Sequence, residues 1–212
     1  MKRNFKFRSL ILALFSVFAI SANAQFYEMG NQLQQMLSPA LSGSFNYKGY
    51  VEASYLRGLG DDRFDVIDIS TTQGFKYSSW LFMGAGAGVD IILPSLDYKH
   101  NVDPIVMIPL YADFRFLIGN QDKVGVNIDL RLGAAFNFSD DFPTNNGHIY
   151  EDECLYLRPS LGIRIPVNKK NSKQAITFGF SYQLLMSEYY GRHGWDETKC
   201  FNNMGATIGF EW

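Results

Sequence analysis

The sequence predicts an all-β fold: an eight-stranded antiparallel up-and-down transmembrane β-barrel, preceded by a signal peptide and a short N-terminal segment. Three observations lead to this prediction. From Asn46 to the end of the 212-residue chain, large apolar residues alternate with small or polar ones at period two, the period of a β-strand. The alternating stretches number eight, an even number as in single-chain bacterial barrels, and most reach the roughly 9–11 residues that cross a bilayer at a tilt. The connections between them are alternately short and long, as is the rule for such barrels.

The alternation places the strands at about 47–56, 64–75, 80–92, 106–117, 124–136, 155–165, 175–185 and 204–212. The short connections follow the second, fourth and sixth strands (76–79, 118–123 and 166–174), and the long ones follow the third, fifth and seventh (93–105, 137–154 and 186–203). Short connections face the periplasm in such barrels, so we expect both barrel termini there. Pro109 and Pro159 fall inside expected strands and lack the ladder donor, which predicts a bulge or a rim position at each.

Residues 1–24 have the pattern of a Sec signal peptide. A basic start is followed by an apolar run from Leu10 to Ile20, interrupted only by Ser16, and by the small-x-small site Ala22-Asn23-Ala24. The run is too short to span about 30 Å of hydrocarbon. Residues 25–45 form an N-terminal periplasmic segment. Apolar residues recur there at helical spacing up to Pro39, which predicts either a short helix or a disordered leader.

Composition excludes two classes of protein. Beyond the signal, no apolar run approaches the roughly 20 residues of a transmembrane helix, so a helical membrane protein is excluded. The formal charge of −2 leaves no basic footprint for nucleic acid.

The polar face of the strands is expected to line the lumen. A soluble lipocalin-like barrel is the alternative, and it would turn its apolar face inward. The polar face here is rich in glycine, which weakens an exposed strand but makes room for long neighbours inside a narrow barrel. These glycines are Gly84, Gly86, Gly88, Gly133, Gly162, Gly179, Gly205 and Gly209.

The same register predicts a charge network in the lumen. It comprises Lys48, Glu52, Asp68, Asp90, Asp113, Arg115, Asp129, Arg131, Arg158, Arg164 and Glu211. Eight strands leave a lumen barely wide enough for side chains, and an unpaired buried charge is costly, so these groups are expected to pair and to plug the barrel as a polar core.

Several stretches resemble the porin-like outer-membrane β-barrel family of Gram-negative bacteria, over residues 46–212. They are Tyr47-Lys48-Gly49-Tyr50, Gln73-Gly74-Phe75, Gly84-Ala85-Gly86-Ala87-Gly88-Val89-Asp90, Ile108-Pro109-Leu110-Tyr111-Ala112-Asp113-Phe114-Arg115 and Arg158-Pro159-Ser160-Leu161-Gly162-Ile163-Arg164. The last strand, with Ile208, Phe210 and the terminal Trp212, resembles the assembly signal of such barrels. The resemblance implies the outer membrane as location, and outer-membrane lipid, lipopolysaccharide and the barrel assembly machinery as partners. It implies no agreed substrate, cofactor or catalytic residue.

Three weaker motifs have simpler explanations. The glycine run at 84–88 has the spacing G-x-G-x-G with no helix after it, so a barrel strand is favoured over a nucleotide site. The three histidines, His100, His148 and His193, lie in expected loops with no serine within two positions, which argues against a lipid A-modifying enzyme. One expected long loop contains five acidic residues: Asp140, Asp141, Glu151, Asp152 and Glu153. They could hold a divalent cation, but a solvated acidic loop is the simpler explanation.

A disulfide between Cys154 and Cys200 is expected, with two free thiols as the alternative. Both cysteines are expected at the extracellular mouth of a protein exported to an oxidising compartment. One strand separates them, so the loop that carries Cys200 would have to lean over it to reach bonding distance.

The sequence thus favours a non-enzymatic barrel with a structural or interaction role, surface-displayed loops and a plugged lumen. A narrow porin for ions or small solutes is the alternative, and a lipid A-modifying enzyme is the third reading.

Overall fold

The computed structural model describes residues 46–60, 64–94, 104–120, 122–138, 149–150, 153–168, 171–190 and 196–212. The expected signal peptide (1–24), the N-terminal segment (25–45), the three histidines and the acidic loop residues before Glu153 lie outside the described residues. Among the residues that are described, no helix is long and apolar enough to cross a bilayer.

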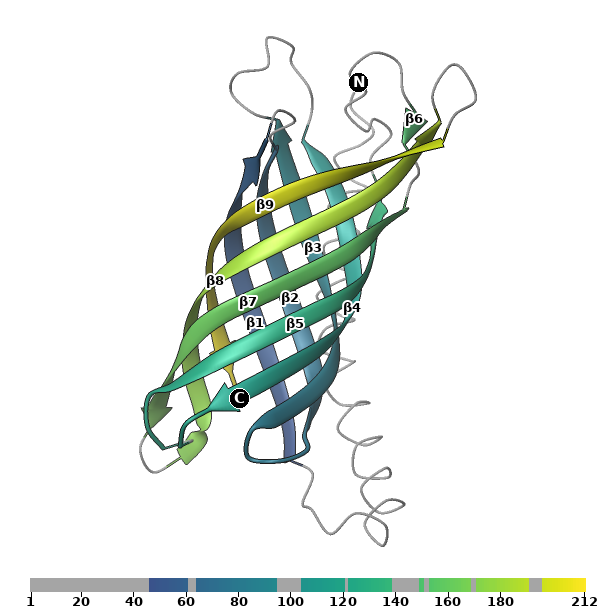
Figure 1. Ribbon diagram of the computed structural model, residues 1–212. Coiled ribbons are helices and arrows are strands. Elements are labelled where there is room, and N and C mark those ends of the chain that lie inside the picture. Colours follow the sequence, from purple (N-terminus) through teal and green to yellow (C-terminus); the bar gives the residue numbers. More distant parts are fainter. Residues whose placement is uncertain are drawn as a thin grey trace, which may run out of the picture.

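Eight long strands form a closed antiparallel barrel in the described part of the chain (Figure 1). They are β1 (Asn46–Leu59), β2 (Phe64–Lys76), β3 (Leu81–Pro94), β4 (Ile105–Ile118), β5 (Gly125–Asn137), β7 (Glu153–Asn168), β8 (Asn171–Tyr190) and β9 (Asp196–Glu211). A two-residue strand, β6 (Ile149–Tyr150), pairs with the end of β8. Each long strand pairs with its neighbours in the chain, and β1 pairs with β9 from Tyr50↔Glu211 to Leu59↔Asn202, which closes the barrel. The predicted eight-stranded antiparallel up-and-down β-barrel is confirmed.

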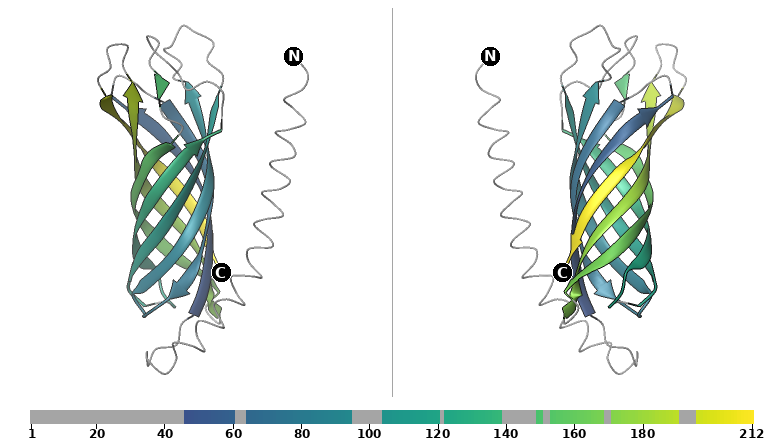
Figure 2. Two further views of the ribbon diagram at one scale, coloured as in Figure 1. Left: turned by 90° about the vertical axis from the view of Figure 1, so that its right-hand side faces the viewer. Right: turned by 90° about the vertical axis from the view of Figure 1, so that its left-hand side faces the viewer.

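The last hairpin is longer than the sequence predicted. The chain from 186 to 203 was expected to be a loop, but β8 continues to Tyr190 and β9 starts at Asp196, with pairs from Met186↔Cys200 to Tyr190↔Asp196. Since β1 pairs with β9 only as far as Asn202, the first six residues of β9 extend past the end of β1. This hairpin projects at the end of the barrel opposite the C-terminus (Figures 1 and 2).

The prediction of a bulge or rim position at the two prolines was wrong. Pro109 pairs with Ala135 in an unbroken β4–β5 register, and the β3–β4 register resumes unchanged on either side of a two-residue gap. Pro159 likewise pairs with Leu130, with a similar gap toward β8. A residue in an antiparallel strand directs its N–H to one neighbour only, so proline interrupts the ladder on one side and leaves the other intact.

Apolar and polar side chains are distributed over the two faces of the barrel wall as predicted. The outward side chains of the strands are large and apolar, and many are more than one-third exposed, such as Ile69, Leu132 and Phe180. The inward side chains are mostly buried and include every charged residue that the sequence placed in the lumen. This arrangement is the reverse of a soluble barrel, which excludes the lipocalin-like alternative.

Candidate functional site in the barrel lumen

Glu52 on β1 is the centre of a charge network that crosses the middle of the lumen. Its carboxylate accepts hydrogen bonds from Nη1 and Nη2 of Arg115 at 3.2 and 2.6 Å, and it also accepts one from Nη2 of Arg131. Arg115 donates to Asp113 at 2.7 Å, and Arg131 lies 3.8 Å from Asp113 and 4.0 Å from Asp129. All five side chains are buried, so this network occupies the cross-section of the barrel at mid-height.

A second cluster lies nearer the mouth that carries the long hairpin. Arg158 donates to Asp68 at 2.6 Å, and it also binds the hydroxyls of Ser54 and Thr207. Asp90, the β3 residue opposite Asp68, accepts a hydrogen bond from Gln183 at 2.7 Å. These contacts join β1, β2, β3, β7, β8 and β9 through side chains that all point inward.

A third cluster lies at the end of the barrel that holds the C-terminus. Glu211 accepts hydrogen bonds from Nε and Nη2 of Arg164 at 2.6 and 3.1 Å, and it is also bound by Lys48. Lys76, at the end of β2, points inward at this level and is only 3% exposed.

All eleven charged residues predicted for the lumen are found there, buried and on the inner face. Lys76 is a twelfth, although it is the first residue of the connection expected after the second strand. Lys76 follows Thr72 by four residues and Gly74 by two, so strand alternation places it on the same inner face of β2. This spacing could have identified it from the sequence. With Lys76 included, six buried cations face six buried carboxylates among the described residues, so the lumen is neutral as a whole.

Buried tyrosines lie between the charged clusters. The Arg115 guanidinium carbon sits 3.8 Å from the centre of the Tyr50 ring, in a cation–π contact. The rings of Tyr111 and Tyr156 stack with their centres 5.7 Å apart. These rings fill space that eight glycine-rich strands would otherwise leave open.

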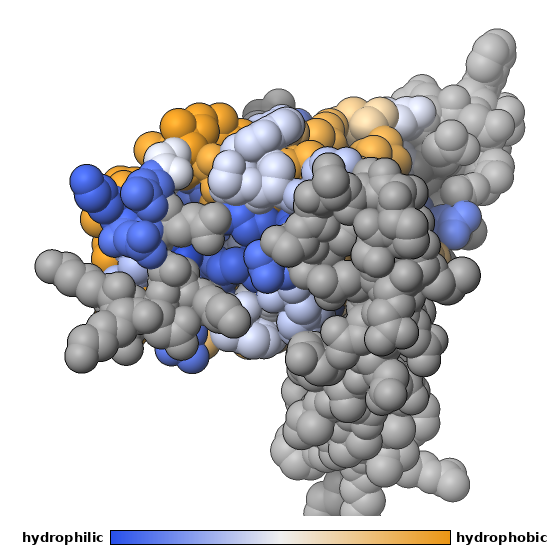
Figure 3. Space-filling model, turned by 90° about the horizontal axis from the view of Figure 1, so that it is seen from below, coloured by the Kyte–Doolittle hydropathy of each residue, from blue (hydrophilic) through white to orange (hydrophobic). Residues whose placement is uncertain are grey.

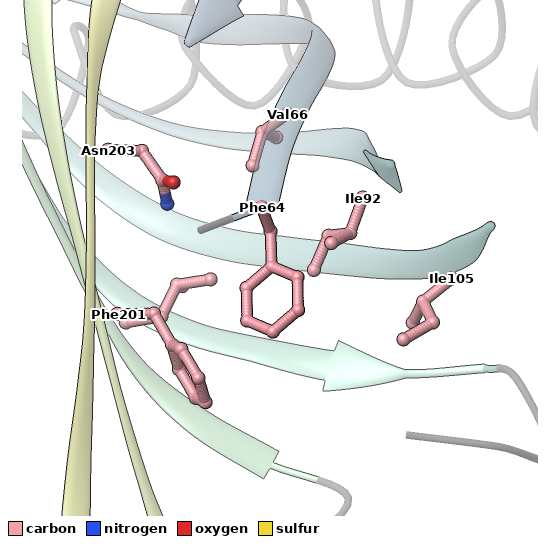
Figure 4. Close-up of a pocket in the computed structure, with 7 residues that line it drawn as sticks. Phe64, Val66, Ile92, Ile105, Phe201 and Asn203 are labelled. Atoms are coloured by element: carbon pink, nitrogen blue, oxygen red, sulfur yellow. The ribbon is translucent and has the colours of Figure 1, made fainter. Parts of the chain in front are cut away.

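The mouth that carries the long hairpin is closed by an apolar layer, which the sequence did not predict. Its buried members are Leu56, Val66, Ile92, Ile105, Met107, Tyr111, Ala135, Cys154, Tyr156, Leu185 and Phe201. Phe64 packs against them from the rim (Figure 4). The cavity between these side chains measures about 10 Å³, room for about one water molecule. The expected plug of polar residues therefore fills only part of the lumen.

The expected disulfide is absent from the structure. Cys154 lies on β7 and points into the lumen, whereas Cys200 belongs to β9, not to a loop, and is exposed on the outer face. Strand β8 runs between them, since its Met186 pairs with both Leu155 and Cys200. Two thiols on opposite faces of the wall with a strand between them cannot reach the 4.4–6.8 Å Cα separation of a bridge.

The outer wall carries aromatic rings at the end that holds the C-terminus. Trp80 stacks on Phe116 with ring centres 6.0 Å apart, and Phe210 stacks on Trp212 at 6.3 Å. Trp212 is joined to Gly49 by two backbone hydrogen bonds of 3.2 and 3.1 Å, and its ring covers the space that a Gly49 side chain would occupy. Ile208, Phe210 and Trp212 thus sit on the outer face of a strand that is paired to its end, while their role as an assembly signal stays a prediction.

Within the described residues, no group of three or more His, Cys, Asp or Glu side chains is arranged to hold a metal ion.

No protein-family model and no curated protein matches the chain. Solved structures do. Neisserial surface protein A (NspA) matches with a TM-score of 0.51 and 13% identity, over 79% of this chain and 97% of that one. The outer membrane protein OprG from Pseudomonas aeruginosa matches at 0.47 and 11%, over 81% and 99%. The N-terminal β-barrel domain of Pseudomonas aeruginosa OprF matches at 0.44 and 12%, over 80% and 100%. The chain is therefore a closed eight-stranded β-barrel with the fold of NspA.

Proposed function

We propose that this protein is an outer-membrane β-barrel with a structural or interaction role and a lumen that is closed to solutes. The closed lumen is the observation that carries the proposal. Two barriers lie in series along the axis: the network centred on Glu52 and the apolar layer around Leu56 and Phe201. An ion crossing the barrel would have to displace buried arginine–carboxylate pairs and then enter an apolar layer, and each step is strongly unfavourable.

The outer wall supports the membrane location. A strand of 14 residues, such as β1, is about 46 Å long at roughly 3.3 Å per residue and rises about 35 Å at a tilt of roughly 40°. That height exceeds the roughly 25 Å apolar band of such barrels. The exposed Trp80 and Tyr77 suit the interface at one edge of the band, and Tyr55, whose hydroxyl donates to Asp65 at 2.6 Å, suits the other.

The proposed orientation places both barrel termini in the periplasm and the long hairpin outside. Its support is the length of the β8–β9 hairpin, because the pairs from Leu185↔Phe201 to Tyr190↔Asp196 continue past the last β1–β9 pair at the end opposite the C-terminus. In this orientation the periplasmic end carries the terminal strand that the assembly machinery would read. The outer end would then meet lipopolysaccharide or a surface ligand.

Conductance across a planar bilayer tests the closed lumen. The refolded protein is expected to give no steady current steps, with a wide porin in the same lipid as positive control. A variant with both Glu52 and Arg131 changed to serine keeps the lumen neutral, and it should also stay closed because the apolar layer remains. Reproducible steps that scale with salt concentration in the unaltered protein would contradict the proposal and favour the narrow porin.

Cys200 gives a test of the orientation. A membrane-impermeant maleimide added to intact cells is expected to label it, because its side chain is exposed at the end that we place outside. A Cys154→Ser variant should be labelled equally and a Cys200→Ser variant should not. Labelling only after the outer membrane is permeabilised would reverse the orientation. Labelling only after reduction would mean that Cys200 is oxidised in the cell.

A further inference from the structure

The end of the lumen that holds the C-terminus carries more positive than negative charge. Lys48, Lys76 and Arg164 all point inward there and are buried. Glu211 is the one buried carboxylate among the described residues at this level, and it already binds both Lys48 and Arg164. Among the described residues, the exposed Asp122 in the turn between β4 and β5 is another carboxylate that acts on Arg164.

Lys76 has no hydrogen-bond partner for its buried Nζ atom. It sits at the end of β2, where the ladder pairs it with Asn46 on β1 and Phe82 on β3, and neither offers an anionic group. A buried ammonium without a counter-charge is strongly unfavourable. The position is therefore suited to an anion that this part of the chain does not provide.

Three neutral polar atoms at the same level are also buried without a partner: Tyr50 Oη, Asn127 Oδ1 and Thr177 Oγ1. The pairing places them around Arg164 and Glu211, because Thr177 lies opposite Arg164, Tyr50 lies opposite Glu211, and Asn127 is two residues from the partner of Arg164. The two hydroxyls can donate, and so can Asn127 if its amide is turned, since oxygen and nitrogen of an amide are assigned from their surroundings.

We propose that this set of residues, the basal site (Lys48, Tyr50, Lys76, Asn127, Arg164 and Thr177), binds a small oxyanion such as a phosphate group. An ammonium, a guanidinium and hydroxyl groups converging on one region are the donors that phosphate oxygens accept from. A single carboxylate that is already paired twice makes a poor cation site. Seen from this end, hydrophilic residues lie next to a band of hydrophobic residues that follows one side of the barrel (Figure 3).

The network centred on Glu52 lies above the basal site and closes the lumen, so the anion would enter and leave from one end only. The site would thus serve binding and not passage. This inference rests on the lumen contacts alone and does not depend on the proposed location or orientation of the barrel.

Thermal unfolding of the full mature chain, refolded in an uncharged detergent, tests the site. The concentration of inorganic phosphate is raised and that of chloride is lowered, so that the ionic strength stays constant. A ligand that binds only the folded state raises the unfolding midpoint with its concentration, so the unaltered protein should show such a rise. The rise should be lost in Lys76→Met and kept in Lys123→Gln, which removes an exposed lysine from the turn at the same end. Lys76→Arg should keep part of the phosphate-dependent rise in the unfolding midpoint.

In chloride alone, Lys76→Met should unfold at a higher temperature than the unaltered protein, because the substitution removes a buried charge without a partner.

Equal phosphate-dependent shifts in Lys76→Met and the unaltered protein, or no shift in either, would overturn the proposal. If Lys76→Met does not fold, the test is whether the unaltered protein broadens the ³¹P resonance of inorganic phosphate. An absence of broadening would equally reject the site. A short-chain phosphatidic acid that acts at lower concentrations than inorganic phosphate would identify a lipid headgroup as the source, and the reverse order would identify free phosphate.

Discussion

Replacement of Glu52 by alanine is expected to lower the free energy of unfolding by about 3–5 kcal/mol, the range for breaking a buried ion pair. Glu52 binds both Arg115 and Arg131 from the other side of the lumen, whereas Asp113 meets them from β4 itself. The removal of Glu52 leaves two guanidiniums, both fully buried, to share Asp113 and the more distant Asp129. The penalty comes mainly from the uncompensated positive charge and less from the lost contacts. Urea unfolding of the refolded barrel, followed by tryptophan fluorescence, measures the change.

A double-mutant cycle separates this cause from a simple loss of packing. Glu52→Ala combined with Arg131→Ala restores a neutral lumen, so the double variant should be more stable than the sum of the two single losses predicts. Glu153→Ala removes an exposed carboxylate at the mouth and should change stability by less than about 0.5 kcal/mol. Strictly additive losses would mean that the two side chains act independently and that the network is not a unit.

The charged lumen could be predicted because strand parity alone assigns a side chain to one face. Once period two is recognised, every second residue of a strand such as Asp113–Arg115 or Asp129–Arg131 must point inward. The pairings could not be predicted in the same way. Asp113 faces Arg131 and Arg115 faces Asp129 in the ladder, yet both arginines reach across the lumen to Glu52, 63 and 79 residues away in sequence. Such contacts depend on the closure and diameter of the barrel.

The apolar layer at one mouth was missed because the alternation disappears where it lies. In Ile91-Ile92-Leu93 and in Ile105-Val106-Met107-Ile108 both faces of the strand are apolar, so period two carries no signal. Burial distinguishes them: Ile92, Ile105 and Met107 point inward and are at most 5% exposed. The disulfide prediction failed for a related reason. It required residues near Cys200 to form a loop, whereas the hairpin pairing continues through them to Asp196.

The inward glycines fall into two groups that the sequence does not separate. A Cβ at Gly179 would approach Leu161 O at 3.1 Å and Gly162 Cα at 3.4 Å, which small shifts can accommodate. Gly133 is different. It pairs with Tyr111 on one side and Tyr156 on the other, beneath their stacked rings, and a Cβ there would collide with the carbonyl oxygen of Leu110 and come within 2.7 Å of Tyr111 Cα.

Gly133→Ala is therefore expected to destabilise the barrel by about 2–3 kcal/mol, at the upper end of the range for overpacking, whereas Gly179→Ala should stay within about 1 kcal/mol of the unaltered protein. The obstacle at Gly133 is backbone, so trimming Tyr156 to leucine in the same chain should not restore stability. Urea midpoints of the four variants, including Tyr156→Leu alone, give the comparison. Recovery on trimming the ring would show that the tyrosine stack, and not the approach of β4 to β5, requires glycine at this position. Equal losses for Gly133→Ala and Gly179→Ala would remove the distinction between the two groups of glycines.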